Sequence, residues 1–127
     1  MSEENNPFNI LGDGPKGEPI LDIDKSKELN KQIEDLISSS KVFLFMKGTP
    51  QAPMCGFSAN VISLLNHHGA NYKTFDILSD MEIRQGVKEF ANWPTFPQLY
   101  IDKELIGGND IVMELYENKE LEAMLKA

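Results

Sequence analysis

The segment Val42-Phe43-Leu44-Phe45-Met46 constrains the fold more than any other part of the sequence. Its residues are all apolar and do not alternate with polar ones, which is typical of a central strand covered on both faces. Such a strand needs a layer of helices on each side of its sheet. The segment therefore predicts an α/β domain in which this strand lies inside the sheet.

Periodicity and turn residues place the other elements around this strand. Helices are predicted over residues 26–40, 57–68, 80–91 and 111–126, with a break near Asn118, and strands over residues 72–77, 98–101 and 104–106. The strand–helix–strand unit implies parallel strands with a right-handed crossover, and a tight turn at Asp102-Lys103 implies a final hairpin. The fold class is then α/β, with a mixed four-stranded sheet and helices on both faces.

The helical patterns also assign individual residues. Ser26 fits the N-cap position of the first helix, and Gly69 is expected to end the second. Phe57 and Phe90 fall on the apolar faces of the second and third helices, so we expect both side chains to be buried.

The chain of 127 residues suits a single folded domain with one core. Residues 1–25 are interrupted by glycines and prolines, and their charged side chains are mostly acidic. We therefore expect residues 1–25 to form a flexible acidic N-terminal extension and residues 26–127 to form the domain.

Composition argues against several classes of function and location. The net charge of −8 argues against nonspecific binding to nucleic acid or to anionic lipid. No apolar run approaches the roughly 20 residues that a membrane-spanning helix needs. A single cysteine fits a reducing compartment. We expect a bacterial cytoplasm, or an organelle matrix after loss of a targeting segment, and not secretion.

Cys55 is the only cysteine, and it lies between a proline-rich loop and a helix start. A helix N-terminus and the nearby Lys47 would both stabilise a thiolate, which is the reactive form of cysteine. A buried structural cysteine is the alternative, although Pro50 and Pro53 favour a shaped, partly exposed loop. With Ser58 in place of a second cysteine, the thiol must act alone, with a small-molecule thiol, or with a second chain.

Three other segments contain candidate binding residues, each with an alternative structural role. Thr95-Phe96-Pro97 would expose backbone groups if Pro97 were cis, although the residues alone favour trans. Asp110, after Gly107-Gly108-Asn109, caps the last helix, binds a ligand, or does both. Arg84 is either a surface arginine or a clamp for a carboxylate. Trp93 is interpreted as a packing residue, and His67 and His68 as structural rather than metal-binding.

Residues 41–126 resemble a monothiol glutaredoxin of the Cys-Gly-Phe-Ser class. The resemblance rests on five blocks in this order: Phe45-Met46-Lys47-Gly48-Thr49-Pro50, Cys55-Gly56-Phe57-Ser58, Ile83-Arg84-Gln85-Gly86, Trp93-Pro94-Thr95-Phe96-Pro97-Gln98 and Gly107-Gly108-Asn109-Asp110-Ile111. It implies a thioredoxin-like fold with Pro97 in cis.

The resemblance also implies a glutathione site. The residues it assigns to that site are Lys47, Cys55, Arg84, Thr95, Phe96, Pro97, Gly108, Asn109 and Asp110. Lys47 and Arg84 would hold the glycyl carboxylate, the Phe96 backbone the cysteinyl unit, and Asn109 with Asp110 the γ-glutamyl end. The family often has cysteine at position 109, so Asn109 departs from its pattern and removes a second thiol.

Two functions follow from this resemblance. In the first, a homodimer binds a [2Fe–2S] cluster through two Cys55 thiolates and two glutathione molecules, because such clusters usually have four thiolate ligands. The homodimer would transfer the cluster to iron–sulfur acceptor proteins and form complexes with a BolA-like protein. In the second, Cys55 acts in a glutathione-dependent thiol oxidoreductase that removes glutathione from proteins, an activity that the resemblance implies is weak.

Overall fold

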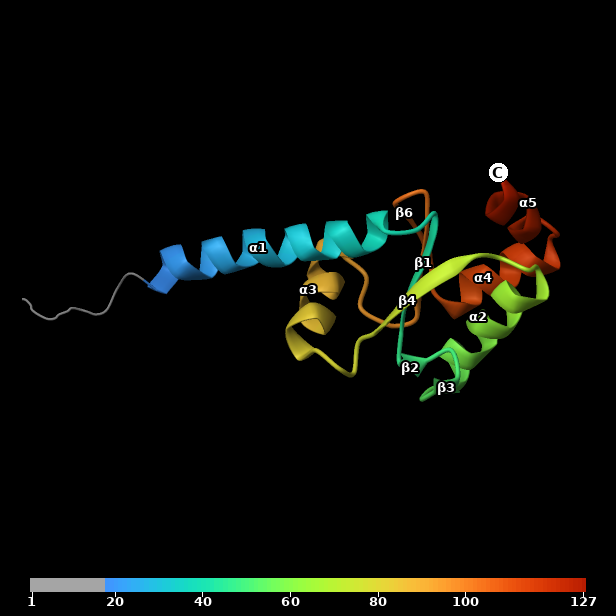
Figure 1. The fold of residues 1–127 in the computed structure, drawn as a ribbon, viewed down its shortest axis with the longest axis horizontal. Coiled ribbons are helices and arrows are strands. Elements are labelled where there is room, and N and C mark those ends of the chain that lie inside the picture. The colour runs from blue at the N-terminus through green and yellow to red at the C-terminus, as the bar shows by residue number, and fades with distance from the viewer. Residues whose placement is uncertain (1–17) are drawn as a thin grey trace, which may run out of the picture. The chain divides into compact units, whose positions relative to one another are not determined.

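The computed structural model describes residues 18–127. Its elements in chain order are α1 (Glu18–Ser38), β1 (Val42–Met46), β2 (Gly48–Thr49), β3 (Ala52–Pro53), α2 (Gly56–His67), β4 (Tyr72–Asp76), α3 (Met81–Ala91), β5 (Gln98–Ile101), β6 (Glu104–Gly107), α4 (Asn109–Glu117) and α5 (Leu121–Lys126) (Figure 1). Residues 32–127 form one compact unit, which holds the last turns of α1 and all later elements. The earlier residues of α1 belong to a separate unit.

The main sheet has the strand order β4-β1-β5-β6. β1 pairs with β4 in parallel and with β5 antiparallel, and β5 and β6 form the final hairpin. Asp102 and Lys103 in its turn both have positive φ, 51° and 70°, which matches the twist of a tight two-residue hairpin. The predicted mixed four-stranded sheet is confirmed.

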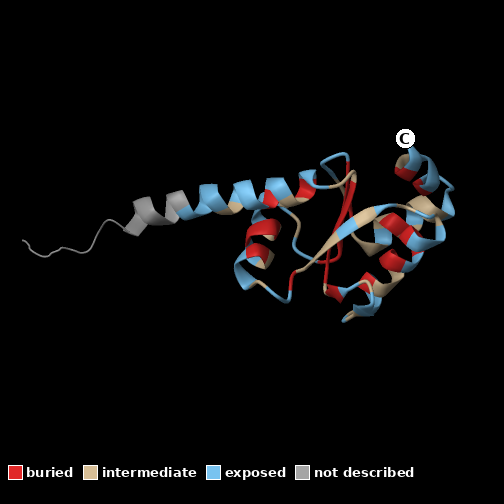
Figure 2. Cartoon of the chain, in the orientation of Figure 1, coloured by how far each residue is buried: buried red, intermediate tan, exposed pale blue. Residues whose placement is uncertain are grey.

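Both faces of β1 are covered, as its sequence predicts (Figure 2). Val42, Leu44 and Met46 belong to a cluster with buried residues of α2, α4 and α5. Phe43 and Phe45 point to the opposite face because side chains alternate along a strand. There the Phe45 ring meets the Tyr100 ring edge-on at a centroid distance of 5.8 Å. Figure 1 shows α2 and α4 on one side of β1 and α3 on the other.

The first helix is longer than its prediction. α1 begins at Glu18, so Ser26 lies within the helix and is not its N-cap. Pro19 does not prevent this start, because N–H groups in the first turn have no intrahelical partner to lose. Residues 1–17 of the predicted extension lie outside the described residues, and the domain boundary near residue 25 stays a prediction.

Two side chains expected in the core are exposed. Phe57 is 60% exposed and Phe90 is 38% exposed. In α2 the buried residues begin at Ser58, and in α3 they end at Val87, so both phenylalanines lie where their helices extend beyond the covered surface.

Other predicted features agree with the structure. α2 ends at the C-cap His68, and Gly69 follows with a left-handed φ of 68°, as expected. The expected break at Asn118 is the C-cap of α4. Among residues 18–127, none of the helices combines the length and the apolar character needed to cross a membrane.

Candidate functional site

Cys55 occupies the N-cap position of α2, with extended backbone angles of φ −154° and ψ 137°. The backbone N–H of Ser58 is the strongest of the groups that lower the pKa of the Cys55 thiol below its usual value. The Phe57 N–H, the charge of Lys47 and the Ser58 hydroxyl act in the same direction, while partial burial opposes them. This direction agrees with the expected stabilisation of the thiolate by a helix start and by Lys47.

The short ribbon of β2 and β3 fixes the loop between Lys47 and Cys55. The Met54 N–H donates to the Lys47 carbonyl at 2.8 Å, and the Gly48 N–H donates to Asp76 Oδ1 at 2.9 Å. The Lys47 N–H donates to the buried hydroxyl of Ser58 at 3.1 Å. These bonds tie the residue that carries the cation to the helix that carries the thiol.

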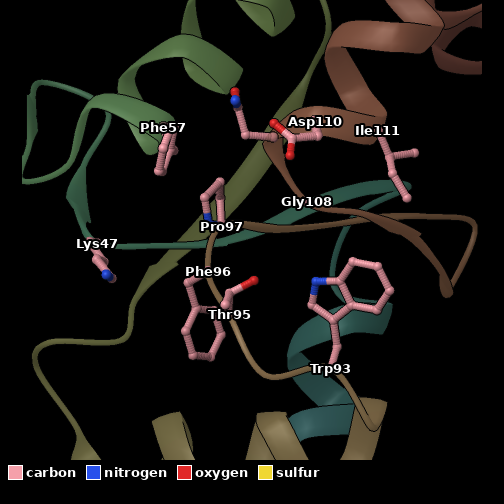
Figure 3. Close-up of a pocket in the computed structure, with 10 residues that line it drawn as sticks. Lys47, Phe57, Trp93, Thr95, Phe96, Pro97, Gly108, Asp110 and Ile111 are labelled. Atoms are coloured by element: carbon pink, nitrogen blue, oxygen red, sulfur yellow. The ribbon is translucent and has the colours of Figure 1, made fainter.

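A cavity of about 450 Å³ lies beside this helix start (Figure 3). Its lining residues are Lys47, Phe57, Trp93, Thr95, Phe96, Pro97, Gly108, Asn109, Asp110 and Ile111. Figure 3 shows Lys47 and Asp110 on different sides of Pro97. Opposite charges separated in this way suit a ligand that carries a carboxylate at one end and an ammonium group at the other.

Most of the predicted site residues line this cavity, but two do not. Cys55 is not a lining residue, although Lys47 is close enough to lower its pKa. Arg84 is also not a lining residue; it lies half-buried in α3, and its backbone N–H donates to the Asp80 carbonyl. Their assignment to a glutathione site stays a prediction, as does that of the residues that do line the cavity.

Three lining residues were not assigned to the site from the sequence: Phe57, Trp93 and Ile111. The signal for Phe57 is its place two residues after Cys55, in the first turn of a helix. Trp93 has the added feature that its indole nitrogen is buried without a hydrogen-bond partner. Ile111 follows Asp110 in the first turn of α4.

The loop before β5 has a cis Phe96–Pro97 peptide bond. This agrees with the family resemblance and corrects the trans form that the residues alone favour. The buried Gln98 holds the loop, because its Nε2 donates to the carbonyls of Trp93 at 3.1 Å and Thr95 at 3.2 Å. Its Oε1 accepts from the Tyr100 hydroxyl at 3.1 Å, and burial raises the pKa of Tyr100 to about 12.

The start of α4 completes the cavity, and it corrects one prediction. The N-cap is Gly108, without a side-chain cap, whereas Asp110 lies exposed in the first turn and does not cap the helix. A Cβ atom at Gly108 would lie 3.3 Å from the Pro97 carbonyl oxygen, a tight contact that a side chain could make only if the Pro97 loop moved slightly. The first N–H groups of α4 are therefore uncapped by side chains and suited to a carboxylate.

The described residues contain no cluster of three or more His, Cys, Asp or Glu side chains that could hold a metal ion. His67 and His68 instead contact the Tyr116 ring at centroid distances of 5.9 and 5.7 Å. The groups that can do chemistry in or beside the cavity are thus the Cys55 thiol, the Lys47 cation and the start of α4.

Known proteins resemble this chain in sequence and in fold. Residues 42–106 match the glutaredoxin family model. The chain is 52% identical over 99 residues to an uncharacterized monothiol glutaredoxin, ycf64-like, of Synechocystis sp., covering 78% of this chain and 92% of that protein. The chain belongs to the monothiol glutaredoxin family. Its single Cys55 and the absence of a second cysteine agree with this membership.

Solved structures confirm the thioredoxin-like fold of this glutaredoxin. Reduced apo GrxS14 of poplar matches with a TM-score of 0.69 at 45% identity, covering 77% of this chain and 90% of that chain. A buckwheat glutaredoxin–glutathione complex matches with a TM-score of 0.72 at 25% identity, covering 81% and 92%.

Proposed function

We propose that this monothiol glutaredoxin binds a glutathione-ligated [2Fe–2S] cluster as a homodimer and transfers the cluster to iron–sulfur acceptor proteins. The observation that carries the proposal is the charged cavity beside a lone, activated thiol. Family membership supports it, and a BolA-like protein as partner rests on the family resemblance. The function requires a reducing compartment that contains glutathione, such as a bacterial cytoplasm or an organelle matrix.

Glutathione fits the charges of the cavity. Its glycyl carboxylate would pair with the Lys47 ammonium, and the Phe96 backbone would pair with the cysteinyl unit. The γ-glutamyl carboxylate would accept from the first N–H groups of α4, and its ammonium would pair with Asp110. The related buckwheat glutaredoxin was solved with glutathione, which supports this choice of ligand. Arg84 would have to reach the glycyl end from outside the residues that line the cavity.

The number of thiolates favours a dimer. A [2Fe–2S] cluster usually has four cysteine-type ligands, and this chain has one cysteine. Two chains supply two Cys55 thiolates, and two glutathione molecules held by the cavities supply the others. The lowered pKa of Cys55 favours the thiolate that a metal requires. Because the glutathione ligands are not covalently attached, the cluster can be passed on as cargo.

The side chains around the thiol suit a second protomer. Met54 is 68% exposed and Phe57 is 60% exposed, and both lie close to Cys55 in the chain. Exposed apolar side chains mark an interaction surface where they form one patch, as these two would around the thiol in the proposed homodimer. In the proposed homodimer these residues would be covered by the other protomer and would shield the cluster from water.

Reconstitution under anaerobic conditions tests this function. The protein is incubated with iron, sulfide and a reductant, with or without glutathione, and absorbance and mass in solution are measured. We expect a coloured dimer only when glutathione is present, and none from Cys55→Ser. A colourless monomer after complete reconstitution with glutathione would contradict the proposal.

A glutathione-dependent thiol oxidoreductase is the second candidate, favoured by the lowered pKa and partial exposure of Cys55. The Cys55 thiolate would attack the glutathione sulfur of a protein mixed disulfide, releasing the protein thiolate and forming Cys55–glutathione disulfide. A second glutathione thiolate would then attack this disulfide, releasing oxidised glutathione and the Cys55 thiolate. Release of glutathione from a glutathionylated protein, measured with protein that holds no cluster, tests this activity separately from cluster binding, and Cys55→Ser serves as the inactive control.

A further inference from the structure

We propose that Asn60 is a positioning residue that sets Asn109 for recognition of the γ-glutamyl end of glutathione. The inference rests on the proposed function, because it concerns how that cavity selects its ligand. Asn60 lies in α2, five residues after Cys55, and Asn109 is the first residue of α4. The sequence around Asn60 and around Asn109 does not predict that these two side chains meet.

A short hydrogen bond joins the two side chains. The Nδ2 of Asn60 donates to Oδ1 of Asn109 at 2.7 Å, across 49 residues of sequence, and both side chains are half-buried. A hydrogen bond between two long-range, partly buried amides holds both in one orientation. It therefore fixes the start of α4 against the helix that carries the thiol.

The direction of this bond decides which group Asn109 offers to a ligand. An asparagine side chain has one accepting oxygen and an NH₂ group with two donors. Asn109 lines the cavity and Asn60 does not, so the Asn109 oxygen is engaged away from the lining surface. We infer that the NH₂ group is the polar end left for the ligand. It adds donors to the N–H groups of α4 at the place proposed for the γ-glutamyl carboxylate.

The hydrogen bond between Asn60 and Asn109 also fixes the distance between the starts of α2 and α4, which glutathione must bridge. The cysteinyl sulfur of glutathione must reach the start of α2, while its γ-glutamyl group must reach the start of α4. Asn60 joins the two helices through a side-chain hydrogen bond, whereas Val61 of α2 and Val112 of α4 belong to the same buried apolar cluster. Loss of the Asn60 bond should leave the core intact and loosen only the γ-glutamyl end.

A double-mutant cycle tests the coupling. Dissociation constants for glutathione are measured by NMR titration of the reduced protein for wild type, Asn60→Ala, Asn109→Ala and the double variant. We expect Asn60→Ala to weaken binding about 3- to 10-fold, the usual effect of one hydrogen bond. In the Asn109→Ala background, Asn60→Ala should cause no further loss. Additive losses would overturn the inference.

Ligand truncation separates positioning from a general structural role. Cysteinylglycine lacks the γ-glutamyl unit, so its affinity should not change in Asn60→Ala. An equal loss for both ligands would show a structural effect and contradict the inference.

Asn60→Asp keeps the size of the side chain but can only accept, so Asn109 must turn its NH₂ group toward it. This variant should bind glutathione more weakly than Asn60→Ala; equal or tighter binding counts against the inference. A wild type that binds no glutathione would overturn the proposed function as well.

Discussion

Ionisation of Cys55 depends on a few groups that can be removed one at a time. The Ser58 N–H is the largest cause of the lowered pKa, and the charge of Lys47 is a smaller one. Because folding lowers the pKa of Cys55, the ionised thiol stabilises the folded state at pH values above the thiol pKa of the unfolded chain. This stabilisation is lost as the pH falls through the thiol pKa of the folded protein.

The rate of Cys55 alkylation should therefore reach half its maximum at a pH below the value of about 8.5 for an ordinary thiol. Lys47→Ala should move this midpoint upward, but only by part of the shift, because the N–H groups at the start of α2 remain. Lys47→Arg retains the charge and serves as the control. The measurement is the iodoacetamide reaction rate as a function of pH; an unchanged midpoint in Lys47→Ala would contradict a role for its charge.

Gly48 is required by both its backbone angle and its surroundings. Its φ is 91°, and a Cβ atom there would lie 2.5 Å from the Ala52 carbonyl oxygen. Gly48→Ala should lower the free energy of unfolding by about 2 kcal/mol or more, because positive φ and a backbone clash act together.

Gly69 provides the matched control for that substitution. Its φ is 68°, but a Cβ atom at this position would have no neighbouring atom within 4 Å. Gly69→Ala should cost only about 1 kcal/mol, the usual penalty for a left-handed residue that is not glycine. Urea denaturation of both variants gives the comparison. Equal losses would mean that the contact with Ala52 is relieved by movement of the ribbon.

At the level of elements, the regular helices and strands follow from local patterns, whereas the ribbon of β2 and β3 does not. β1, β4 and β5 agree with their predicted ranges to within a residue, because apolar runs and turn residues are read over a few neighbours. The ribbon has only two residues in each strand, too few for a periodic signal. It is held by Asp76, a residue 28 positions from Gly48.

The conformation of the loop before β5 is held by the side chain of Gln98, just as the ribbon is held by that of Asp76. Gln98→Leu should lower the free energy of unfolding by about 2–4 kcal/mol, because the carbonyls of Trp93 and Thr95 lose their donor and Tyr100 loses its acceptor. Tyr100→Phe removes the hydroxyl but keeps both loop bonds, so its loss should be smaller. Urea denaturation measures the stability of both variants, and glutathione titration reports whether the loop has moved. A larger loss for Tyr100→Phe would contradict the assigned role of Gln98.

At the level of the whole molecule, the proposed homodimer requires that exposed side chains around Cys55, such as Met54, contact the second protomer. Met54 is not a lining residue of the cavity, so it should not affect glutathione binding by the monomer. Met54→Ser should shorten the lifetime of the cluster-bound dimer several-fold, because a protomer contact loses apolar area. Its free energy of unfolding should change by less than about 0.5 kcal/mol.

The lifetime is read from the decay of cluster absorbance, and the two controls are glutathione affinity and urea stability. If Met54→Ser left the lifetime unchanged while both controls held, the Met54 surface would not be part of the dimer interface.

The local sequence was sufficient for the central position of β1, for the mixed sheet and for one thiol at a helix start. Each of these is predicted by patterns among residues close together in the chain, namely apolar periods and backbone preferences, together with the rules for connecting neighbouring strands. The outward position of Phe57, the role of Gln98 and the bond between Asn60 and Asn109 depended on the tertiary structure. They require distant segments to meet, and that is decided by how the elements pack on the sheet. The thiol was thus visible in the sequence, and the family resemblance named seven of the ten residues that line the cavity, but only the tertiary structure shows that they surround one cavity.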